Sequence, residues 1–307
     1  MSDSLAAAAD VCYRPRRSAR YSEIEGREGN IALTQWGPSD QPPVVLLHGW
    51  MDCAAAWQLL VDGLPDDWPL LAVDWPGYGR SAWRTDRYWF SDHFAELDWL
   101  LSEVSPQTPV RLIGHSMGGT VASMYAGIRP QRVRWAVNLE GFGMPELPHA
   151  QLPGFIAGWL DSLCAPPTAR TYASLDELAV VIRRANPRLP AAHAYYLASV
   201  WAREADDQFV MRADPRQQSR TPIRYTRGEV EACWSQVTAP MLLLYGSDSI
   251  HMQKAMGTDA LTRMRQLMPA LRAESIADAG HLLPYEQPQR VAQAIKSFAD
   301  MHATTRL

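Results

Sequence analysis

The segment Gly114-His115-Ser116-Met117-Gly118-Gly119 has the Gly-x-Ser-x-Gly spacing of an activated serine nucleophile. It directly follows the apolar run Val110–Ile113 and begins a stretch with helical spacing. A sharp turn from strand to helix holds the serine hydroxyl out from the sheet edge, beside the free N–H groups of a helix N-terminus. Glycines two residues before and after the serine leave room for the neighbouring strand and helix. We therefore expect Ser116 to attack an electrophilic carbonyl carbon; the alternative interpretation is an exposed serine in a glycine-rich turn.

A histidine must accompany such a serine, because a hydroxyl becomes a strong nucleophile only when a base removes its proton. His281 lies in Ala279-Gly280-His281, between the last expected strand and the last expected helix. That position is at the carboxyl edge of a parallel sheet, where the active sites of α/β proteins lie. His281 also completes the chain order serine, acid, histidine. We predict that it is the general base; the alternative is a histidine that caps a helix or packs.

Two N–H groups must also point to the place where the attacked carbonyl oxygen gains negative charge. The amide of Met117, the residue after the nucleophile, is the first expected donor. The second is expected from the loop after Val44–Leu47, which reads His48-Gly49-Trp50. Because Gly49 allows the backbone to come close, we assign the second oxyanion-hole donor to the amide of Trp50.

Two carboxylates compete for the role of orienting His281. Glu140 follows one expected strand, and Asp248 follows another, in Gly246-Ser247-Asp248-Ser249. Both come after the serine and before the histidine, and both lie at a sheet edge; the longer glutamate suits the more distant strand. Each also has a structural interpretation, since Glu140 could pair with an arginine and Asp248 could cap the next helix. These residues leave the choice between Asp248 and Glu140 open.

Short apolar runs bounded by glycine, proline or aspartate predict the strands that must position these side chains, buried on both faces of a parallel sheet. The runs are Val44–Leu47, Leu70–Val73, Val110–Ile113, Trp135–Leu139 and Met241–Tyr245, and a last strand is expected at Arg272–Ile276, before His281. Helical stretches alternate with them, at Ala54–Leu64, Phe90–Val104, Met117–Ile128, Gln253–Met268 and Gln289–Ala299. An N-terminal hairpin is expected from Tyr21–Glu25 and Ile31–Trp36. This alternation predicts an α/β fold with a doubly wound, mostly parallel sheet.

The alternation stops between Met144 and Pro240, where 95 residues contain no convincing strand. Connections in such folds are about two to six residues long, so this interval is an inserted structure. Capping-box patterns at Ser174-x-x-Glu177 and Thr226-x-x-Glu229 indicate helices, and we interpret the interval as a helical lid. The expected organisation is a flexible tail at 1–20, an α/β core at 21–143 and 238–307, and a helical cap at 144–237.

Composition excludes several classes of partner. With 29 basic and 33 acidic residues the formal net charge is −4, which argues against nucleic acid. The four cysteines, of which Cys12 and Cys53 are the closest pair, form no disulfide framework or zinc pattern, and we expect neither metal nor cofactor. No apolar run approaches the ~20 residues that span a bilayer, and no signal peptide is evident. We expect a cytoplasmic protein without membrane contact; the sequence leaves a homo-oligomer open.

Taken together, these segments resemble the α/β-hydrolase family over residues 30–302. The matching signatures are His48-Gly49, Asp74-Trp75-Pro76-Gly77-Tyr78-Gly79-Arg80-Ser81, Gly114–Gly118 and Gly280-His281. The resemblance implies the α/β-hydrolase fold with a helical cap between the sixth and seventh strands, where the 95-residue interval falls. It also implies a serine hydrolase with a nucleophile elbow, an oxyanion hole and a catalytic triad.

The family pattern does not decide which carboxylate is the triad acid. Members often read Gly-x-x-Asp after the seventh strand, but here Asp248 comes one residue early and Ser249 occupies the expected position. The segment Val133–Pro145 resembles the region after the sixth strand of haloalkane dehalogenases, some of which take their acid from the position of Glu140. The Leu139-Glu140-Gly141 pattern is also similar to the serine hydrolase-like (Kraken-like) branch. Both carboxylates therefore remain candidates.

The expected reaction is hydrolysis of a small-molecule carboxylic ester through an acyl-enzyme, on short-to-medium acyl chains, because an aromatic cap predicts a modest apolar pocket. Thioester, lactone and carbon–carbon bond hydrolysis use the same triad and stay open. A non-catalytic ligand-binding protein of the same fold is the alternative of another class. Dehalogenase activity is disfavoured, because Ser116 and Met117 stand where that chemistry needs a carboxylate and a tryptophan. Since His281 must be neutral, kcat/KM is expected to rise through a pKa of about 6.5.

Overall fold

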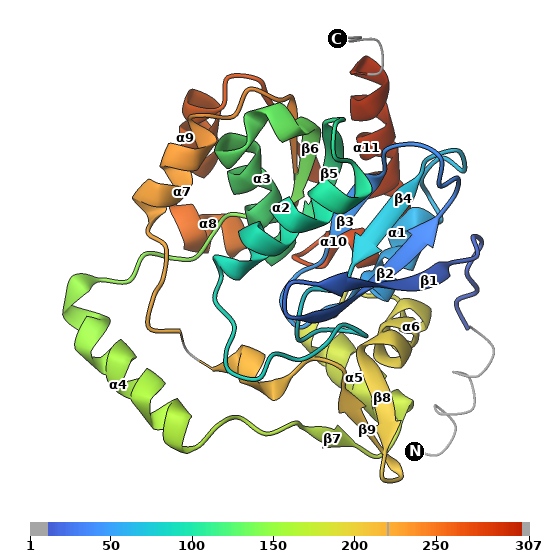
Figure 1. Ribbon diagram of the computed structural model, residues 1–307, viewed down its shortest axis with the longest axis vertical. Helices are drawn as coiled ribbons and strands as arrows, with labels where there is room; N and C mark the ends of the chain where they lie inside the picture. Colours follow the sequence, from blue (N-terminus) through green and yellow to red (C-terminus); the bar gives the residue numbers. More distant parts are fainter. Residues whose placement is uncertain (1–11, 220, 303–307) are drawn as a thin grey trace.

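The central feature of the fold is an eight-stranded sheet, seen in a computed structural model that describes residues 12–219 and 221–302 (Figure 1). Its strands, in spatial order, are β1 (Arg20–Gly26), β2 (Gly29–Trp36), β4 (Leu70–Val73), β3 (Val44–Leu47), β5 (Val110–His115), β6 (Val133–Leu139), β10 (Met241–Gly246) and β11 (Leu271–Ile276). The six strands from β4 to β11 pair in parallel, whereas β1 and β2 are antiparallel. The α/β fold with a mostly parallel sheet is confirmed.

Helices cover both faces of this sheet because its central strands are apolar on both sides. One face packs against α2 (Asp92–Val104), α3 (Met117–Ile128), α7 (Arg227–Trp234) and α9 (Ala260–Leu267). The other face packs against the 3₁₀ turn η2 (Ala54–Trp57), α1 (Gln58–Val61), α10 (Leu283–Glu286) and α11 (Pro288–Met301). The expected helix Gln253–Met268 is divided at Gly257, whose φ of 82° ends α8 (His251–Met256) before α9 begins.

The insertion after β6 is not purely helical as predicted. It contains η4 (His149–Gln151), α4 (Leu152–Cys164), α5 (Leu175–Ala185), α6 (Ala191–Trp201) and η5 (Pro215–Gln218), together with a small antiparallel sheet of β7 (Thr171–Tyr172), β9 (Gln208–Met211) and β8 (Ala202–Ala205). The turn between β8 and β9 is Asp206-Asp207, both with positive φ, a conformation that suits tight hairpins. Strands of two to four residues are too short for an alternating pattern to reveal them.

The C-terminal part of the predicted cap packs with the core. Helix α7 begins at a capping box of Thr226 and Glu229, as predicted, but lies against α3. Its Trp234 is fully buried and donates a hydrogen bond from Nε1 to Ser123 Oγ at 3.0 Å. The insertion that stands apart from the sheet therefore ends before α7, earlier than the expected boundary at residue 237.

The predicted tail also differs from the structure where the two overlap. Residues 1–11 lie outside the described residues. From Tyr13 onward the chain is fixed to the core, since the Tyr13 hydroxyl donates to Asp62 Oδ2 at 2.5 Å. The buried Arg17 side chain donates to the carbonyl oxygens of Pro65 and Asp66 at 3.0 and 3.2 Å. Arg17 thus satisfies carbonyl oxygens of the loop after α1, which a charge pattern alone does not reveal.

Helix α4 stands away from the rest of the molecule (Figure 1). None of its residues is buried, and Leu160 and Leu163 are more than half exposed. Within the part of the chain that the structure describes, no helix has the length and apolarity needed to cross a bilayer.

Candidate active site

Ser116 occupies a sharp turn between β5 and α3. Its backbone has φ 53° and ψ −113°, a conformation that a residue other than glycine rarely adopts. A Cβ atom at Gly114 would lie 2.2 Å from the Gly118 carbonyl oxygen, and one at Gly118 would lie 2.0 Å from the Leu47 carbonyl oxygen. Both glycines are therefore required by close backbone packing, and the strand–turn–helix arrangement inferred from the sequence is present.

His281 lies directly against this serine. Its Nε2 is 2.9 Å from Ser116 Oγ, although the two residues are far apart in the sequence. The loop that carries His281 follows β11 and is held by the Gly280 N–H, which donates to the buried carboxylate of Glu286. His115 Nε2 lies 2.8 Å from the His281 carbonyl oxygen, and because that oxygen can only accept, His115 is protonated on Nε2.

Glu140 is the carboxylate that contacts the other side of this imidazole. Its side chain is fully buried, and Oε2 lies 3.2 Å from His281 Nδ1. Two further donors hold the carboxylate: the Gly246 N–H bonds Oε1 at 2.8 Å, and the Ser249 hydroxyl bonds Oε2 at 2.5 Å. Burial raises the pKa of Glu140, whereas the hydrogen bonds from Ser249 and Gly246 lower it.

Asp248, the rival carboxylate, is directed elsewhere. Its Oδ2 accepts from Arg188 Nε at 2.8 Å and pairs with Nη2 of the same side chain at 2.7 Å. The Asp248 side chain is 41% exposed, which leaves the ion pair in contact with solvent. The loop after β10 instead turns Ser249 toward Glu140. The structure thus brings Ser116, His281 and Glu140 together and leaves Asp248 out.

The two predicted oxyanion-hole residues flank the serine. Met117 is the first residue of α3, so its N–H has no acceptor within the helix's own hydrogen-bond ladder. The loop with Trp50 passes close by, since a Cβ at Gly49 would lie 3.2 Å from Ser116 Cβ. The exposed Trp50 indole donates from Nε1 to the Gln217 carbonyl oxygen at 3.0 Å, which ties this loop to the insertion.

Burial sets the charge state of the histidines. It lowers the pKa of His281 to about 4 and that of His115 to about 3. His281 is therefore neutral at pH 7 and able to accept the serine proton. The sequence-based expectation of a pKa of about 6.5 did not include this desolvation, because the depth of the site is not visible in the sequence.

Asp52 links the oxyanion loop to two other elements. Its Oδ2 accepts from the Tyr285 hydroxyl of α10 at 2.6 Å, and its Oδ1 accepts from Trp201 Nε1 of α6 at 2.7 Å. Burial raises the pKa of Asp52 to about 6. This buried carboxylate therefore fixes the cap helix α6 to the loop that carries Trp50.

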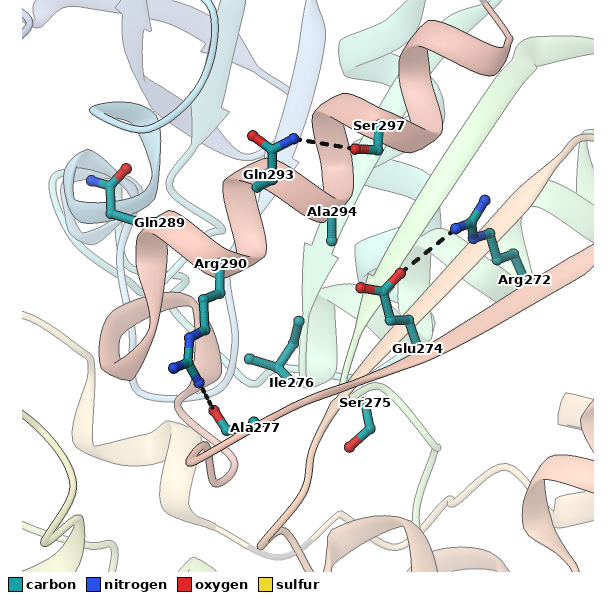
Figure 2. A pocket seen from close by; sticks show the side chains of 10 residues that line it. All are labelled: Arg272, Glu274, Ser275, Ile276, Ala277, Gln289, Arg290, Gln293, Ala294 and Ser297. Carbon is teal, nitrogen blue, oxygen red and sulfur yellow. Dashed lines mark hydrogen bonds and ion pairs between the residues drawn. The ribbon is translucent and has the colours of Figure 1, made fainter.

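A hollow of about 520 Å³ lies away from these residues, beside the edge strand β11 (Figure 2). It is lined by side chains of β11 and α11, among them Arg272, Glu274 and Arg290. Ser116 and His281 are not among its lining residues, so it is not a continuation of the serine site. Among the residues that the structure describes, no cluster of histidine, cysteine, aspartate or glutamate is arranged to hold a metal ion.

Comparison with known proteins agrees with this architecture. A family model described as alpha/beta hydrolase fold matches residues 42–288. The chain is 28% identical over 291 residues to the serine hydrolase-like protein of Danio rerio, covering 92% of this chain and 89% of that protein. It is 27% identical over 276 residues to lipase LipV of Mycobacterium tuberculosis, covering 87% of this chain and 97% of the lipase. A thioesterase domain from the curacin biosynthetic pathway matches with a TM-score of 0.79 at 23% identity, covering 91% of this chain and 99% of the domain; that likeness concerns the fold.

Proposed function

The chain belongs to the alpha/beta hydrolase family, and from that premise we propose that it is a serine hydrolase that cleaves carboxylic esters through an acyl-enzyme. The observation that carries the proposal is the 2.9 Å contact between Ser116 Oγ and His281 Nε2, with Glu140 behind the ring. A nucleophile in contact with a base, and a base in contact with an orienting carboxylate, make up the arrangement that activates a serine.

In the first half of the reaction, Ser116 Oγ attacks the ester carbonyl carbon while His281 Nε2 takes the hydroxyl proton. The carbonyl oxygen becomes an oxyanion, which the amides of Trp50 and Met117 stabilise by hydrogen bonds. As the tetrahedral intermediate collapses, the C–O bond to the alcohol breaks and His281 returns the proton to the departing oxygen. Ser116 is left as an acyl ester.

The second half repeats these steps with water. His281 removes a proton from the water as it attacks the acyl carbon, and then returns that proton to Ser116 Oγ as the acid leaves. Throughout, Glu140 accepts a hydrogen bond from His281 Nδ1, which keeps Nε2 unprotonated in the resting state. When His281 becomes an imidazolium, the Glu140 carboxylate stabilises its charge. We assign the triad acid to Glu140 rather than to Asp248.

The substrate proposed is a small ester with a short-to-medium acyl chain. The lipase named among the relatives acts on esters according to its name, which supports this bond type over an amide. The side chain next to the nucleophile supports an apolar acyl group, since Met117 is apolar and half-buried. Thioesters and lactones have the same reactive carbonyl and belong in the same substrate panel.

The test combines turnover with covalent labelling. Ser116→Ala should abolish hydrolysis of p-nitrophenyl esters and leave the Tm nearly unchanged, because Ser116 Oγ contributes no buried packing. A fluorophosphonate should form an adduct on Ser116 in the unmodified chain. Ser102→Ala, an exposed serine of α2, is the matched control and should retain full turnover and labelling. Turnover or labelling that survives Ser116→Ala would remove Ser116 from the nucleophile role.

A further inference from the structure

A second histidine stacks on the base. The ring of His251 lies with its centroid 3.8 Å from that of His281, at an interplanar angle of 24°. The ring of His115 lies farther away, with its centroid 5.1 Å from that of His281 and an interplanar angle of 42°. The imidazole that must accept and return protons thus has two other imidazoles as neighbours.

The backbone that holds His251 is connected to the site. His251 is the first residue of α8, and its N–H donates to Ser249 Oγ at 3.3 Å. The same hydroxyl donates to Glu140 Oε2 at 2.5 Å. Ser249 therefore fixes both the carboxylate behind His281 and the residue that stacks on it. His251 itself is exposed, so its side chain can be changed without opening the core.

We propose that His251 is a positioning residue for the reaction: its neutral ring holds the His281 imidazole in the plane that joins Ser116 to Glu140, and its protonation opposes formation of the His281 imidazolium. The inference rests on the proposed hydrolase function. A flat ring at stacking distance restricts rotation of His281 out of line, and a neutral π-face favours a cation beside it. A second cation at 3.8 Å does the opposite.

Several charged groups act on His251 from the surrounding elements. Partial desolvation of the ring is the largest cause that lowers the pKa of His251; His281 lowers it further, the Glu140 carboxylate raises it, and Lys254 lowers it. His115 is neutral, because burial lowers its own pKa to about 3. Arg227 donates to the Ala255 carbonyl oxygen of α8. The balance favours neutral His251 at neutral pH, and acid converts it into a cation beside the base.

Three variants separate the ring from its charge. His251→Phe keeps a flat ring and removes the titration, whereas His251→Ala removes both. Lys254→Ala is the matched control, because it removes a charge from the same helix without touching the stack. Each variant is assayed for kcat and KM on a p-nitrophenyl ester across the acidic and neutral range. Histidine-selective ¹⁵N NMR titration follows His281 in the same proteins.

We expect His251→Ala to lower kcat about 2–10-fold with KM unchanged, which corresponds to loss of one aromatic pair. His251→Phe should keep kcat within about 2-fold at neutral pH. The fall of kcat at acidic pH should depend on one protonation fewer than in the unmodified chain. His281 should titrate as a coupled pair in the unmodified chain and in one step in His251→Phe. Lys254→Ala should retain the coupled titration.

Two results would overturn the inference. One is a His251→Ala enzyme with unchanged kcat together with an unchanged His281 titration in His251→Phe. The other is a His251→Phe enzyme that is as impaired as His251→Ala at neutral pH, since the stacked ring would then be irrelevant. The NMR titration needs no turnover, so a coupled pair in a protein inert to every ester would contradict the hydrolase function and not the coupling of the two rings.

Discussion

Glu140→Gln should reduce kcat by about 10⁴, or about 5.4 kcal/mol of transition-state stabilisation. The structure gives the reason. The Glu140 carboxylate accepts from three donors: the Gly246 N–H, the Ser249 hydroxyl and His281 Nδ1. A glutamine has one oxygen, which the Gly246 N–H occupies, and so its amide NH₂ faces His281. Nδ1 must then accept a hydrogen bond, which moves the ring proton to Nε2, the atom that has to take the proton of Ser116.

Moving the acid to a neighbouring position should recover part of this loss. An aspartate at position 249 places a carboxylate where the Ser249 hydroxyl now lies 2.5 Å from Glu140 Oε2. In the double variant Glu140→Gln, Ser249→Asp we expect kcat to rise at least tenfold above Glu140→Gln. In Ser249→Asp alone, two carboxylates about 3 Å apart repel by about 5 kcal/mol at an effective dielectric constant of about 20, so one of them stays protonated at neutral pH.

The assay is initial-rate hydrolysis of a p-nitrophenyl ester at saturating substrate, with Tm measured on every variant. Asp248→Asn is the control, because Asp248 pairs with Arg188 on the surface; we expect kcat within about 3-fold, as for an exposed ion pair. The reasoning would be refuted if Asp248→Asn lost orders of magnitude while Glu140→Gln did not. Equal, small losses in both variants would also refute it, since neither carboxylate would then orient the base.

Two further outcomes follow from burial and from close packing. Because burial lowers the pKa of His281 to about 4, kcat/KM should stay level as the pH falls from neutral and reach half its plateau only near pH 4. A decline centred at about 6.5 or above would show that the charge of Glu140 outweighs desolvation. Gly118→Ala should lower the free energy of unfolding by about 3 kcal/mol, because the added Cβ would lie 2.0 Å from the Leu47 carbonyl oxygen. Thermal unfolding checks this against Gly154→Ala on α4, where a Cβ meets nothing within 4 Å; equal Tm values would contradict it.

The sequence predicts most of the sheet because its strands are buried on both faces. Val44–Leu47 and Leu70–Val73 are strands with the bounds that their apolar runs indicate. The nucleophile turn is predictable for the same reason, since glycine spacing, strand and helix are all local. His281 follows from its place between the last strand and the last helix. Each of these inferences depends on residues within one short stretch of chain.

The identity of the triad acid and the details of the insertion depend on contacts between residues far apart in the sequence, which local patterns do not contain. Glu140 and Asp248 have equivalent surroundings in the sequence, and only the path of the loop after β10 turns Asp248 toward Arg188. The small sheet of the insertion consists of strands too short to show a period. The pKa of His281 depends on how deeply the ring is covered, which involves several separate elements.

A backbone feature shared by Ser116 and Glu140 supports the assignment of the acid. Both have positive φ, 53° and 59°, at the ends of the adjacent strands β5 and β6. Each strained residue is held by its own strand neighbour: the Ser116 N–H donates to the Leu139 carbonyl oxygen, and the Glu140 N–H donates to that of Leu244. Such backbone costs about 1–3 kcal/mol per residue and persists where the surroundings fix it. A glycine at position 140 would relieve the strain but could not contact His281, so the strained glutamate is best explained by that contact.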